Sequence, residues 1–565
     1  MRGKSYFTIV ITVFAIAAAM RLAPLFWSPL PSTLDGFEFV SIARDMLATG
    51  AYPIDARLRA DHLVLTLLTG VASAVTGEQP LYVIQPLISV IGAAVVVAGI
   101  AIVRRLATNL GWTDKRTRDA TLSTGLLLAV EGLFLRRTTE PDSEVLGMLL
   151  TLLSVIALYR ILWNGANRWA IPFVVFLFTF PILHIFSTFN AAVALTTLLA
   201  LAITTRPNRR TVILGSLLVA AFWAVFIGYY ELVQQLELFS VSYVGRVRNR
   251  PGLFVAWLLA AGIGAAWFQR ASSRVQRFLF VAPLAVLFTL VVVNTFVPIY
   301  PGTIQSPPEV AILISLLAVP VAVAGYAAPA LSKHSEYAPV VLALLVGPLI
   351  IVYFSLTAAL TPDYFATGMR AQTFMHVPAF VLVGIGAVGF LHKRAAESVP
   401  WRAVRTVVVI VLFTSTLFTA PLAFVSLDTF HHPATISESE FDTAGHANTY
   451  LDGHTTDHVQ MRLARQHPTG EDASVSMGPT QEWLRGGGEP QCAVVSLDSW
   501  VTHGAYFFPS APQTIDSGSY QSFINRRNLI YANSGRDPLI ITKPRHVSEE
   551  TKCSFTPGLS TNAGV

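Results

Sequence analysis

Two carboxylates stand close together just after the first apolar stretch of the chain. Asp35 and Glu38 lie in the segment Leu34-Asp35-Gly36-Phe37-Glu38-Phe39, which follows an apolar run that ends near Phe26. Positions i and i+3 of a helix share one face, so both carboxylates could converge on one substrate. A carboxylate at a membrane boundary is costly to desolvate, and such groups commonly do chemistry or bind a ligand. The alternative is structural, because Asp35 could cap a short helix over residues 41–48.

A second charged segment combines arginines with carboxylates between two apolar runs. It reads Arg136-Arg137-Thr138-Thr139-Glu140-Pro141-Asp142-Ser143-Glu144. The positive-inside rule disfavours arginines in a loop on the outer side, so an anionic phosphate or the neighbouring carboxylates must offset the cost. The alternative interpretation is a helix that begins at Pro141, with Asp142 and Glu144 favourably placed against its dipole.

Two arginines in later loops are candidates for binding phosphate. Arg246 belongs to the loop 231–251, and Arg370 ends the segment Thr361-Pro362-Asp363-Tyr364-Phe365-Ala366-Thr367-Gly368-Met369-Arg370 just before an apolar run. A guanidinium can donate two parallel hydrogen bonds to a phosphate, which an ammonium cannot do. The alternative for Arg370 is a surface ion pair with Asp363, which would contribute little to stability.

The elements that must position these residues are membrane helices. Hydrophobic residues make up 53% of the chain and charged residues 13%, a composition typical of polytopic membrane proteins. A helix needs roughly 20 apolar residues to cross the bilayer, and this criterion predicts about thirteen spans. The predicted spans are 6–27, 82–103, 120–135, 145–163, 170–187, 189–205, 211–230, 252–268, 278–297, 310–330, 339–358, 375–391 and 406–425.

Basic residues predict the orientation of these spans. They cluster in alternate loops, on the same side as an N-terminus that carries Arg2 and Lys4, and such loops are cytoplasmic. The net charge of +6 therefore reflects topology, and it does not indicate a nucleic-acid partner. The segments 28–81, 136–144, 231–251, 298–309 and 359–374 and the whole C-terminus are predicted to lie outside the cell membrane.

The chain changes character after residue 425. Residues 1–425 are predicted to form the transmembrane domain, and residues 426–565, rich in polar and acidic side chains, an extracellular soluble domain of α/β or mixed structure. Strand-like runs occur at 492–496 and 539–542. The two cysteines, Cys492 and Cys553, could form a disulfide or remain thiols. Three histidines, His446, His454 and His458, are expected to be solvated, because a zinc site needs an ordered set of ligands.

The charged segments carry a resemblance to a known superfamily. The Asp35 segment, followed by Gly50-Ala51-Tyr52-Pro53, resembles the first outer loop of the GT-C membrane glycosyltransferases. Glu140-Pro141-Asp142 resembles the acidic E/D-x-D motif in the second outer loop of oligosaccharyltransferases. The resemblance implies a GT-C-like helical fold in which Asp35, together with Glu38, is catalytic. It also implies that Arg370, Arg136, Arg137 and Arg246 contact the donor phosphate.

Within this superfamily the chain looks similar to archaeal dolichol-phosphate-mannose mannosyltransferases. The W-W-D-Y-G motif with which oligosaccharyltransferases read the acceptor sequon does not occur after Ser426. The resemblance therefore implies transfer of one sugar, expected to be mannose, from a polyprenyl- or dolichyl-phosphate donor to a glycan or glycoprotein acceptor in protein N-glycosylation. A monophosphate has less charge to neutralise than a pyrophosphate, so no metal cofactor is expected.

Two alternatives remain at this point. An oligosaccharyltransferase-like enzyme would use a pyrophosphate donor and a divalent metal, with Glu140, Asp142 and Asp35 as natural ligands. A transporter or flippase for lipid-linked sugars would place ionisable groups and broken helices near the middle of the membrane and would show internal repeats. Most carboxylates of this chain lie in predicted outer loops instead, and no repeat is visible.

Overall fold

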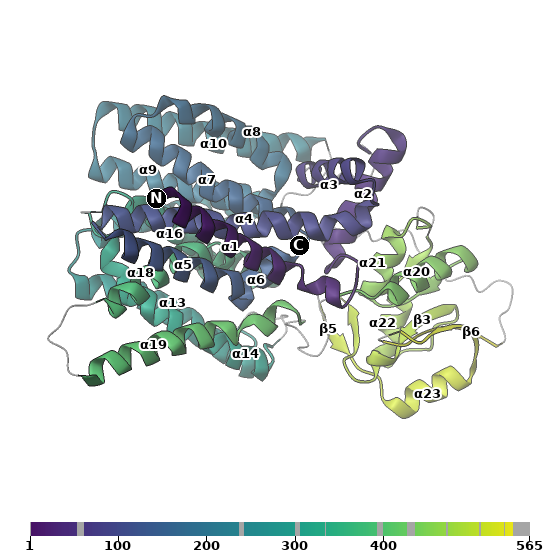
Figure 1. The fold of residues 1–565 in the computed structure, drawn as a ribbon. Coiled ribbons are helices and arrows are strands. Elements are labelled where there is room, and N and C mark those ends of the chain that lie inside the picture. Colours follow the sequence, from purple (N-terminus) through teal and green to yellow (C-terminus); the bar gives the residue numbers. More distant parts are fainter. Residues whose placement is uncertain are drawn as a thin grey trace.

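The computed structural model describes most of the chain. The described residues are 2–53, 61–236, 242–299, 305–333, 335–392, 399–425, 435–470, 473–507, 510–535 and 537–545. The first part of the chain forms a bundle of long helices, and the last part forms a mixed α/β unit at one end of that bundle (Figure 1).

Ten helical segments in the described residues are long and apolar enough to cross a membrane, which makes this a multi-pass membrane protein, as predicted. They are Pro80–Asn109 (α4), Ser143–Asn164 (α7), Ile185–Thr205 (α9), Arg209–Gln235 (α10), Pro251–Phe268 (α12), Ser273–Phe296 (α13), Pro308–Leu331 (α14, α15 and η3), Ala338–Ala358 (α16), Pro362–Leu391 (α17 and α18) and Ala403–Ala423 (α19 and η4). The other predicted spans coincide with shorter or more polar helices, namely α1 (Arg2–Arg21), α5 (Asp114–Val130) and α8 (Ala170–Leu183).

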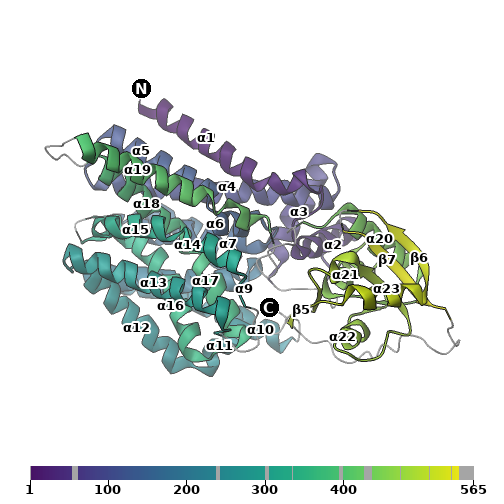
Figure 2. The same cartoon turned by 90° about the horizontal axis from the view of Figure 1, so that it is seen from below.

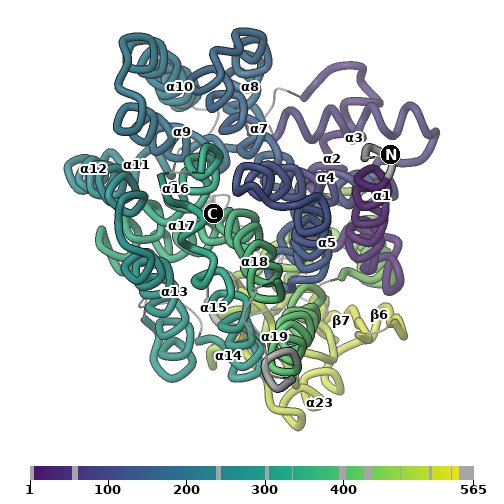
Figure 3. The backbone as a smooth tube through the Cα atoms, turned by 60° about the vertical axis from the view of Figure 1, so that its left-hand side comes forward, coloured from purple at the N-terminus to yellow at the C-terminus, as the bar shows by residue number. Residues whose placement is uncertain are grey.

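The bundle has a centre and a lipid-facing periphery (Figure 3). In α9, 83% of an apolar 18-residue stretch is buried inside the protein, whereas in α13 only 11% of the corresponding stretch is buried. Small residues allow the close approach of the central helices α9 and α16. A Cβ atom added to Gly347 would stand 2.9 Å from the Cα atom of Ala194. Small residues at such crossings let membrane helices gain van der Waals contact without a water-driven force.

Several predicted loops contain helices. The 28–81 segment holds α2 (Leu34–Thr49) and α3 (Leu63–Thr76), and the 136–144 segment overlaps the end of α6 (Gly132–Thr139). The 231–251 and 359–374 segments hold α11 (Ser242–Asn249) and α17 (Pro362–Thr373). These helices are short or only partly apolar, so their sequence lacks the long apolar run by which the spans were predicted.

The C-terminal part is built on a mixed five-stranded sheet in the order β2-β1-β3-β7-β6. The strands are β1 (His454–Thr455), β2 (Val475–Ser476), β3 (Ala493–Leu497), β6 (Arg527–Asn533) and β7 (Leu539–Pro544), with a separate hairpin of β4 (Ala505–Phe507) and β5 (Ser510–Gln513). Strands β1, β2 and β3 are parallel, whereas β7 is antiparallel to β3 and β6. The strand-like runs at 492–496 and 539–542 are thus confirmed as β3 and β7.

Four helices complete this part: α20 (Glu438–Tyr450), α21 (His458–Gln466), α22 (Gly478–Leu484) and α23 (Ser517–Asn525). Its core includes Trp500, Phe523 and Ile541, all completely buried. The expectation of solvated histidines is wrong for His454, which is buried in the sheet. Cys492 is disulfide-bonded, and Cys553 lies outside the described residues. The domain boundary near residue 425 stays a prediction, since residues 426–434 also lie outside them.

Helix α2 joins the two parts of the molecule. Figure 2 shows α2 between the helical bundle and helices α20 and α21. The contact has an apolar centre, in which the rings of Phe37 and Phe441 lie 5.2 Å apart between centroids, surrounded by Leu30 and Met461. We call the end of the bundle that carries α2, α3 and α6 the α2 end.

Candidate active site

The first carboxylate pair lies in the opening turns of α2. The N-cap residue is Thr33, and its side chain makes no capping bond. Helix α2 starts at Leu34, so Asp35 falls inside its first turn and is not the cap of a helix over residues 41–48. The i and i+3 spacing places both carboxylates against one guanidinium. Arg462 Nη2 of α21 lies 2.9 Å from Asp35 Oδ1 and 3.2 Å from Glu38 Oε2.

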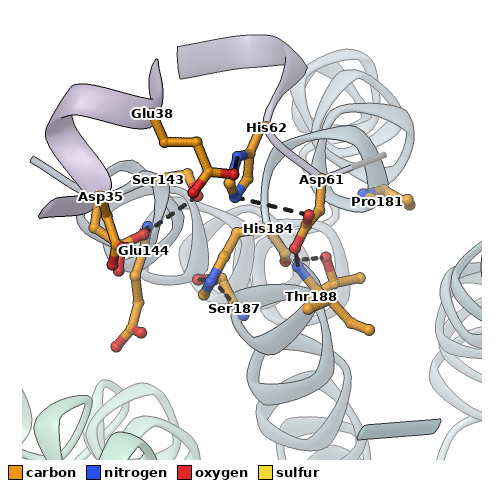
Figure 4. A network of polar contacts seen from close by, with 12 residues as sticks. Asp35, Glu38, Asp61, His62, Ser143, Glu144, Pro181, His184, Ser187 and Thr188 are labelled. Carbon is orange, nitrogen blue, oxygen red and sulfur yellow. Dashed lines mark hydrogen bonds and ion pairs between the residues drawn. The ribbon is translucent and has the colours of Figure 1, made fainter. Parts of the chain in front are cut away.

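A second set of polar groups continues from Glu38 into the bundle (Figure 4). His62 Nδ1 lies 3.7 Å from Glu38 Oε1, and His62 Nε2 lies 3.9 Å from Asp61 Oδ1. The other Asp61 oxygen accepts a hydrogen bond of 3.4 Å from the backbone N–H of Ile185, at the start of α9. Asp61 and His62 are both buried. Charged and polar side chains therefore connect the C-terminal part, α2 and the first turn of α9.

The second charged segment is organised around one arginine. Arg137 at the end of α6 donates to Glu140 at 2.8 Å, approaches Asp142 Oδ2 at 3.1 Å and also bonds Glu144. Arg136 pairs with Glu140 at 3.2 Å and donates to the backbone oxygen of Val425 at 2.7 Å. Neighbouring carboxylates thus supply the compensation that the two arginines require at this position. Whether either arginine also binds a donor phosphate stays a prediction.

Asp142 serves as the N-cap of α7. Its Oδ1 accepts a hydrogen bond of 3.0 Å from the backbone N–H of Glu144, so the helix begins at Ser143, beside the predicted start at Pro141. Burial alone would raise the pKa of the Asp142 carboxyl, but the Arg137 guanidinium outweighs burial and holds that pKa well below its ordinary value. Asp142 is therefore ionised, and the positive end of the α7 dipole also stabilises its negative charge.

The two acidic segments meet at the α2 end. A Cβ atom built on Gly36 would stand 3.1 Å from Cβ and 3.3 Å from Cγ of Pro141. Pro141 lies between Glu140 and Asp142, so the start of α2 rests directly on the second acidic segment. The structure therefore brings together two of the groups of residues that the sequence singled out.

Arg370 joins this neighbourhood from α17. Its guanidinium acts electrostatically on Asp142, whose pKa it helps to lower after the larger effects of burial, Arg137 and His184. Arg370 donates to the Tyr243 hydroxyl at 3.1 Å. The alternative pairing of Arg370 with Asp363 is not what the structure shows, because Asp363 lies 3.5 Å from Arg246 instead.

Arg246 of α11 contacts α17 about one helical turn before Arg370. It donates to the Thr367 hydroxyl of α17 and lies over the ring of Tyr243 at 4.6 Å from the centroid. Tyr243 thus contacts both arginines, and α11 and α17 form one basic corner. This corner is a cationic group close enough to the second acidic segment for Arg370 to act electrostatically on Asp142.

Among the residues that the structure describes, one group of side chains could hold a metal ion. Ligand atoms of Asp142, Glu144 and His184 all lie within 4.8 Å of one another, and all three residues are buried. Glu144 Oε1 is buried without a hydrogen-bond partner in the described part of the chain, which fits a cation ligand. However, Arg137 already bonds the other Glu144 oxygen and approaches Asp142, so its guanidinium supplies positive charge to the same carboxylates.

Sequence reasoning missed four residues of this site: Asp61, His62, His184 and Arg462. In the sequence His184 is a polar residue inside the predicted span 170–187, and in the structure its Nδ1 caps α9 by accepting from the N–H of Ser187 at 3.3 Å. The adjacent Asp61-His62 pair just before an apolar run was an available signal. Arg462 had none, because 427 positions separate it from Asp35.

Comparison with known proteins finds likeness in structure alone. No family model matches the chain, and no curated protein sequence does. The oligosaccharyltransferase AglB from Archaeoglobus fulgidus, in complex with an inhibitory peptide and a dolichol-phosphate, matches with a TM-score of 0.51 and 12% identity over 84% of this chain. The same enzyme tethered to an acceptor peptide containing the NVT sequon matches with a TM-score of 0.51 and 11% identity over 87% of this chain.

The matched proteins differ in how much of their own length this chain covers. The chain spans 64% and 69% of the two oligosaccharyltransferase chains. ArnT from Cupriavidus metallidurans bound to undecaprenyl phosphate matches over 94% of this chain and 97% of its own, at 13% identity and with a low TM-score of 0.36. The first two matches show that the chain shares its overall fold with this oligosaccharyltransferase, so the GT-C-like helical fold expected from the sequence is confirmed.

Proposed function

We propose that this protein is a glycosyltransferase that moves one sugar, mannose by the sequence resemblance, from a polyprenyl- or dolichyl-phosphate donor to a glycan or glycoprotein acceptor. The observation that carries the proposal is the meeting of the two acidic segments through Gly36 and Pro141. Through this contact the carboxylates of α2 lie beside the second acidic segment. Arg370 acts electrostatically on Asp142 of that segment. In a GT-C-like fold this end of the helical bundle is expected to lie at the membrane boundary.

In this proposal Asp35 acts as the general base. The acceptor hydroxyl oxygen attacks the anomeric carbon of the sugar, and Asp35 takes the hydroxyl proton. The bond from that carbon to the phosphate oxygen breaks, and the lipid phosphate leaves with the electron pair. The side chain of Asp35 is 45% exposed and that of Glu38 is 22% exposed, so Asp35 is the more accessible of the two. A positioned base contributes about 10²–10⁴-fold in rate.

The basic corner formed by Arg246 and Arg370 suits the leaving phosphate. Guanidinium groups held in advance stabilise charge as it develops and need no reorganisation during the reaction. Tyr243, bound to both arginines, fixes their position. Arg136 and Arg137 are the other proposed phosphate contacts, although each already bonds a carboxylate.

An apolar groove lined in part by the last turn of α17 suits the lipid tail of the donor. Its walls include Phe280, Leu284, Ile314 and Phe380 from the membrane helices, and it reaches Gln372 and Met375 just after Arg370 in the chain. A polyprenyl chain in the groove would place its phosphate near the basic corner. Holding the donor in this way converts a bimolecular encounter into an oriented one, which lowers the entropic part of the barrier.

The direct test measures sugar transfer from a purified polyprenyl-phosphate sugar by the detergent-solubilised protein. Asp35→Asn should abolish transfer, with a loss of about 10²-fold or more, while the protein remains folded. Asp45→Asn is the matched control, because Asp45 lies on the same helix and pairs with Arg44 at 3.0 Å. Activity of Asp35→Asn within a few-fold of wild type would remove Asp35 from the mechanism.

The orientation of the chain belongs to the same proposal. We place the N-terminus in the cytoplasm and the C-terminal domain outside. This orientation requires the N-terminus and the C-terminal domain to lie on opposite sides of the membrane. In Figure 1, α1 starts at the end of the bundle opposite to the C-terminal sheet, which agrees with that requirement. Membrane-impermeant thiol labelling should reach cysteines introduced near Gly36, Ser143 and Gly453 and miss those near Asp114 and Asn208. Labelling near Asp114 and Asn208 but not near Gly36, Ser143 and Gly453 would show that the protein has the opposite orientation in the membrane.

A second candidate function is oligosaccharide transfer from a lipid pyrophosphate. It is favoured by the cluster of Asp142, Glu144 and His184, which could hold a divalent cation for the more highly charged donor. Mass spectrometry of surface glycans from a deletion strain separates the two functions. One missing sugar at the end of the glycan supports single-sugar transfer, whereas complete loss of protein-bound glycans supports the oligosaccharyltransferase.

A further inference from the structure

Arg462 makes a charged contact between the C-terminal part and the proposed catalytic carboxylates. One nitrogen, Nη2, reaches both Asp35 at 2.9 Å and Glu38 at 3.2 Å. The Arg462 side chain is 24% exposed, so most of it is shielded from water. Hydrogen bonds between charged partners are about twice as strong as neutral ones, and they restrain the orientation of the groups that they join.

The helix that carries Arg462 is firmly held. Asp457 caps α21 by accepting from the backbone N–H of Gln460 at 3.0 Å, and it also accepts from the indole N–H of Trp500 at 3.1 Å. Met461 of α21 is buried in the apolar cluster that includes Phe37 of α2. The direction of the Arg462 side chain is therefore set by packing on both sides of the contact.

The two carboxylates differ in their other surroundings. Glu38 lies between Arg462 and His62, with His62 Nδ1 at 3.7 Å. His458, one turn before Arg462 on α21, also acts electrostatically on this region, since Asp35 influences its pKa. Glu38 is thus contacted by two side chains from different segments, and Asp35, the more exposed carboxylate, is contacted by Arg462.

We propose that Arg462 is a positioning residue supplied by the C-terminal domain, which orients the Asp35 carboxylate, so that the transfer site is complete only when this domain is docked on α2. The inference rests on the proposed function of Asp35. A misplacement of about 1 Å at a reacting group can cost about 10²-fold in rate, and one contact between the domains is enough to control such a displacement. Glu38 then serves as the fixed side of the bridge.

The test measures kcat and KM separately for Arg462→Gln and Arg462→Lys. Arg462→Gln should lower kcat by about 10–100-fold, with the donor KM unchanged within about 2-fold, because the proposed phosphate contacts lie elsewhere. Arg462→Lys keeps a cation within reach of both carboxylates and should restore most of kcat. Arg465→Gln is the matched control, since Arg465 lies on the same helix and donates to the backbone oxygen of Val475.

A purely structural role for Arg462 predicts a different pattern. Phe441→Leu weakens the same interface without touching the ion pair, so a purely structural role predicts that it lowers kcat as much as Arg462→Gln does, whereas the positioning role predicts a smaller loss. If Arg462→Gln has wild-type kcat, or if Arg462→Lys is as impaired as Arg462→Gln, the inference is wrong. A double variant with Glu38→Gln should lose less than the product of the single effects, since both changes break one bridge.

The outcomes also separate this inference from the proposed function. An inactive Asp35→Asn protein together with a fully active Arg462→Gln protein would overturn the positioning role and leave Asp35 as the base. Full activity of both variants would overturn both statements. Loss of kcat in both, with rescue by lysine at position 462, supports both.

Discussion

Gly36 of α2 lies directly against Pro141, the residue between Glu140 and Asp142. A Cβ atom on Gly36 would stand 3.1 Å from Pro141 Cβ and 2.6 Å from Pro31 Cβ. The separation of 2.6 Å from Pro31 forces one of the two groups to move, the separation of 3.1 Å from Pro141 is tighter than an ordinary contact, and both neighbours are stiff proline rings. The absence of a side chain at position 36 therefore allows the two acidic segments to touch.

We expect Gly36→Ala to push α2 away from Pro141 and to reduce sugar transfer more than it reduces stability. Overpacking of this kind costs about 1–3 kcal/mol, whereas a small shift of a catalytic group can cost about 10²-fold in rate. Transfer assays and thermal unfolding of the purified protein measure the two effects. Gly228→Ala is the matched control, because a Cβ atom there meets nothing within 4 Å. Equal activity of the two variants would contradict this prediction.

Arg137 should be essential for folding. Arg137→Met leaves the buried Glu144 and the nearly buried Asp142 without their common cation, and breaking a buried pair in this way costs about 3–5 kcal/mol. Arg136→Met should cost less, because Arg136 is more exposed and Glu140 keeps its bond to Arg137. The yield of folded protein and its melting temperature measure the difference. A stable Arg137→Met protein that fails only in donor binding would instead assign Arg137 to the phosphate.

Arg370 is expected to bind the donor phosphate. Arg370→Lys should be poorly tolerated, because a single ammonium cannot reproduce two parallel hydrogen bonds, and the defect should appear as a raised KM for the donor. Tyr243→Phe should give a milder form of the same defect, since it removes the hydroxyl that Arg370 contacts at 3.1 Å. Arg248→Ala is the control on α11, where the side chain is 69% exposed. Wild-type donor use by Arg370→Ala would exclude this role.

The membrane helices could be predicted because each depends on one local property, an apolar run of sufficient length. The site could be predicted only in part. Asp35 and Glu38 share a face, as the spacing indicated, but the residue that joins them, Arg462, comes from another part of the chain. No local pattern can indicate a partner 427 positions away.

The second acidic segment shows the same limit. The sequence left a choice between a functional role and a helix that begins at Pro141, with Asp142 and Glu144 placed against its dipole. The structure shows a helix that begins at Ser143, with Asp142 as its cap. It also brings His184 next to Asp142 and Glu144, although in the sequence His184 is separated from both by about forty residues and lies inside a predicted span. The pairing of Asp363 with Arg246 depends on how α11 packs on α17, which is a tertiary property.

The C-terminal part should show a pH-dependent stability that comes from Asp457. Burial raises the pKa of this carboxyl from 3.8 to about 6. A raised pKa in the folded state means that the stability from Asp457 is fully present below about pH 4 and is lost as the pH rises through about 6. A shift of about 2 units corresponds to about 3 kcal/mol.

Asp457→Asn removes this titration while keeping an oxygen that can accept a hydrogen bond. Melting temperatures of both proteins between pH 4 and pH 7 measure the effect, and wild type should lose stability relative to the variant across this range. His454, with its pKa lowered to about 4 by burial, favours stability at higher pH, but it is common to both proteins and cancels in the comparison. A difference that stays constant with pH would contradict the assignment.

The last prediction concerns metal dependence. If the donor is a lipid monophosphate, transfer should continue in excess chelator, because guanidinium groups carry the positive charge that the leaving phosphate requires. Arg137 already provides a cation to Asp142 and Glu144. His184→Ala should then lower activity only through the lost cap of α9. Complete inhibition by chelator with rescue by Mg²⁺ or Mn²⁺, together with a metal requirement that His184→Ala or Glu144→Gln weakens, would contradict this prediction. That result would favour a pyrophosphate donor, because its greater charge calls for a divalent cation held by oxygen and nitrogen ligands.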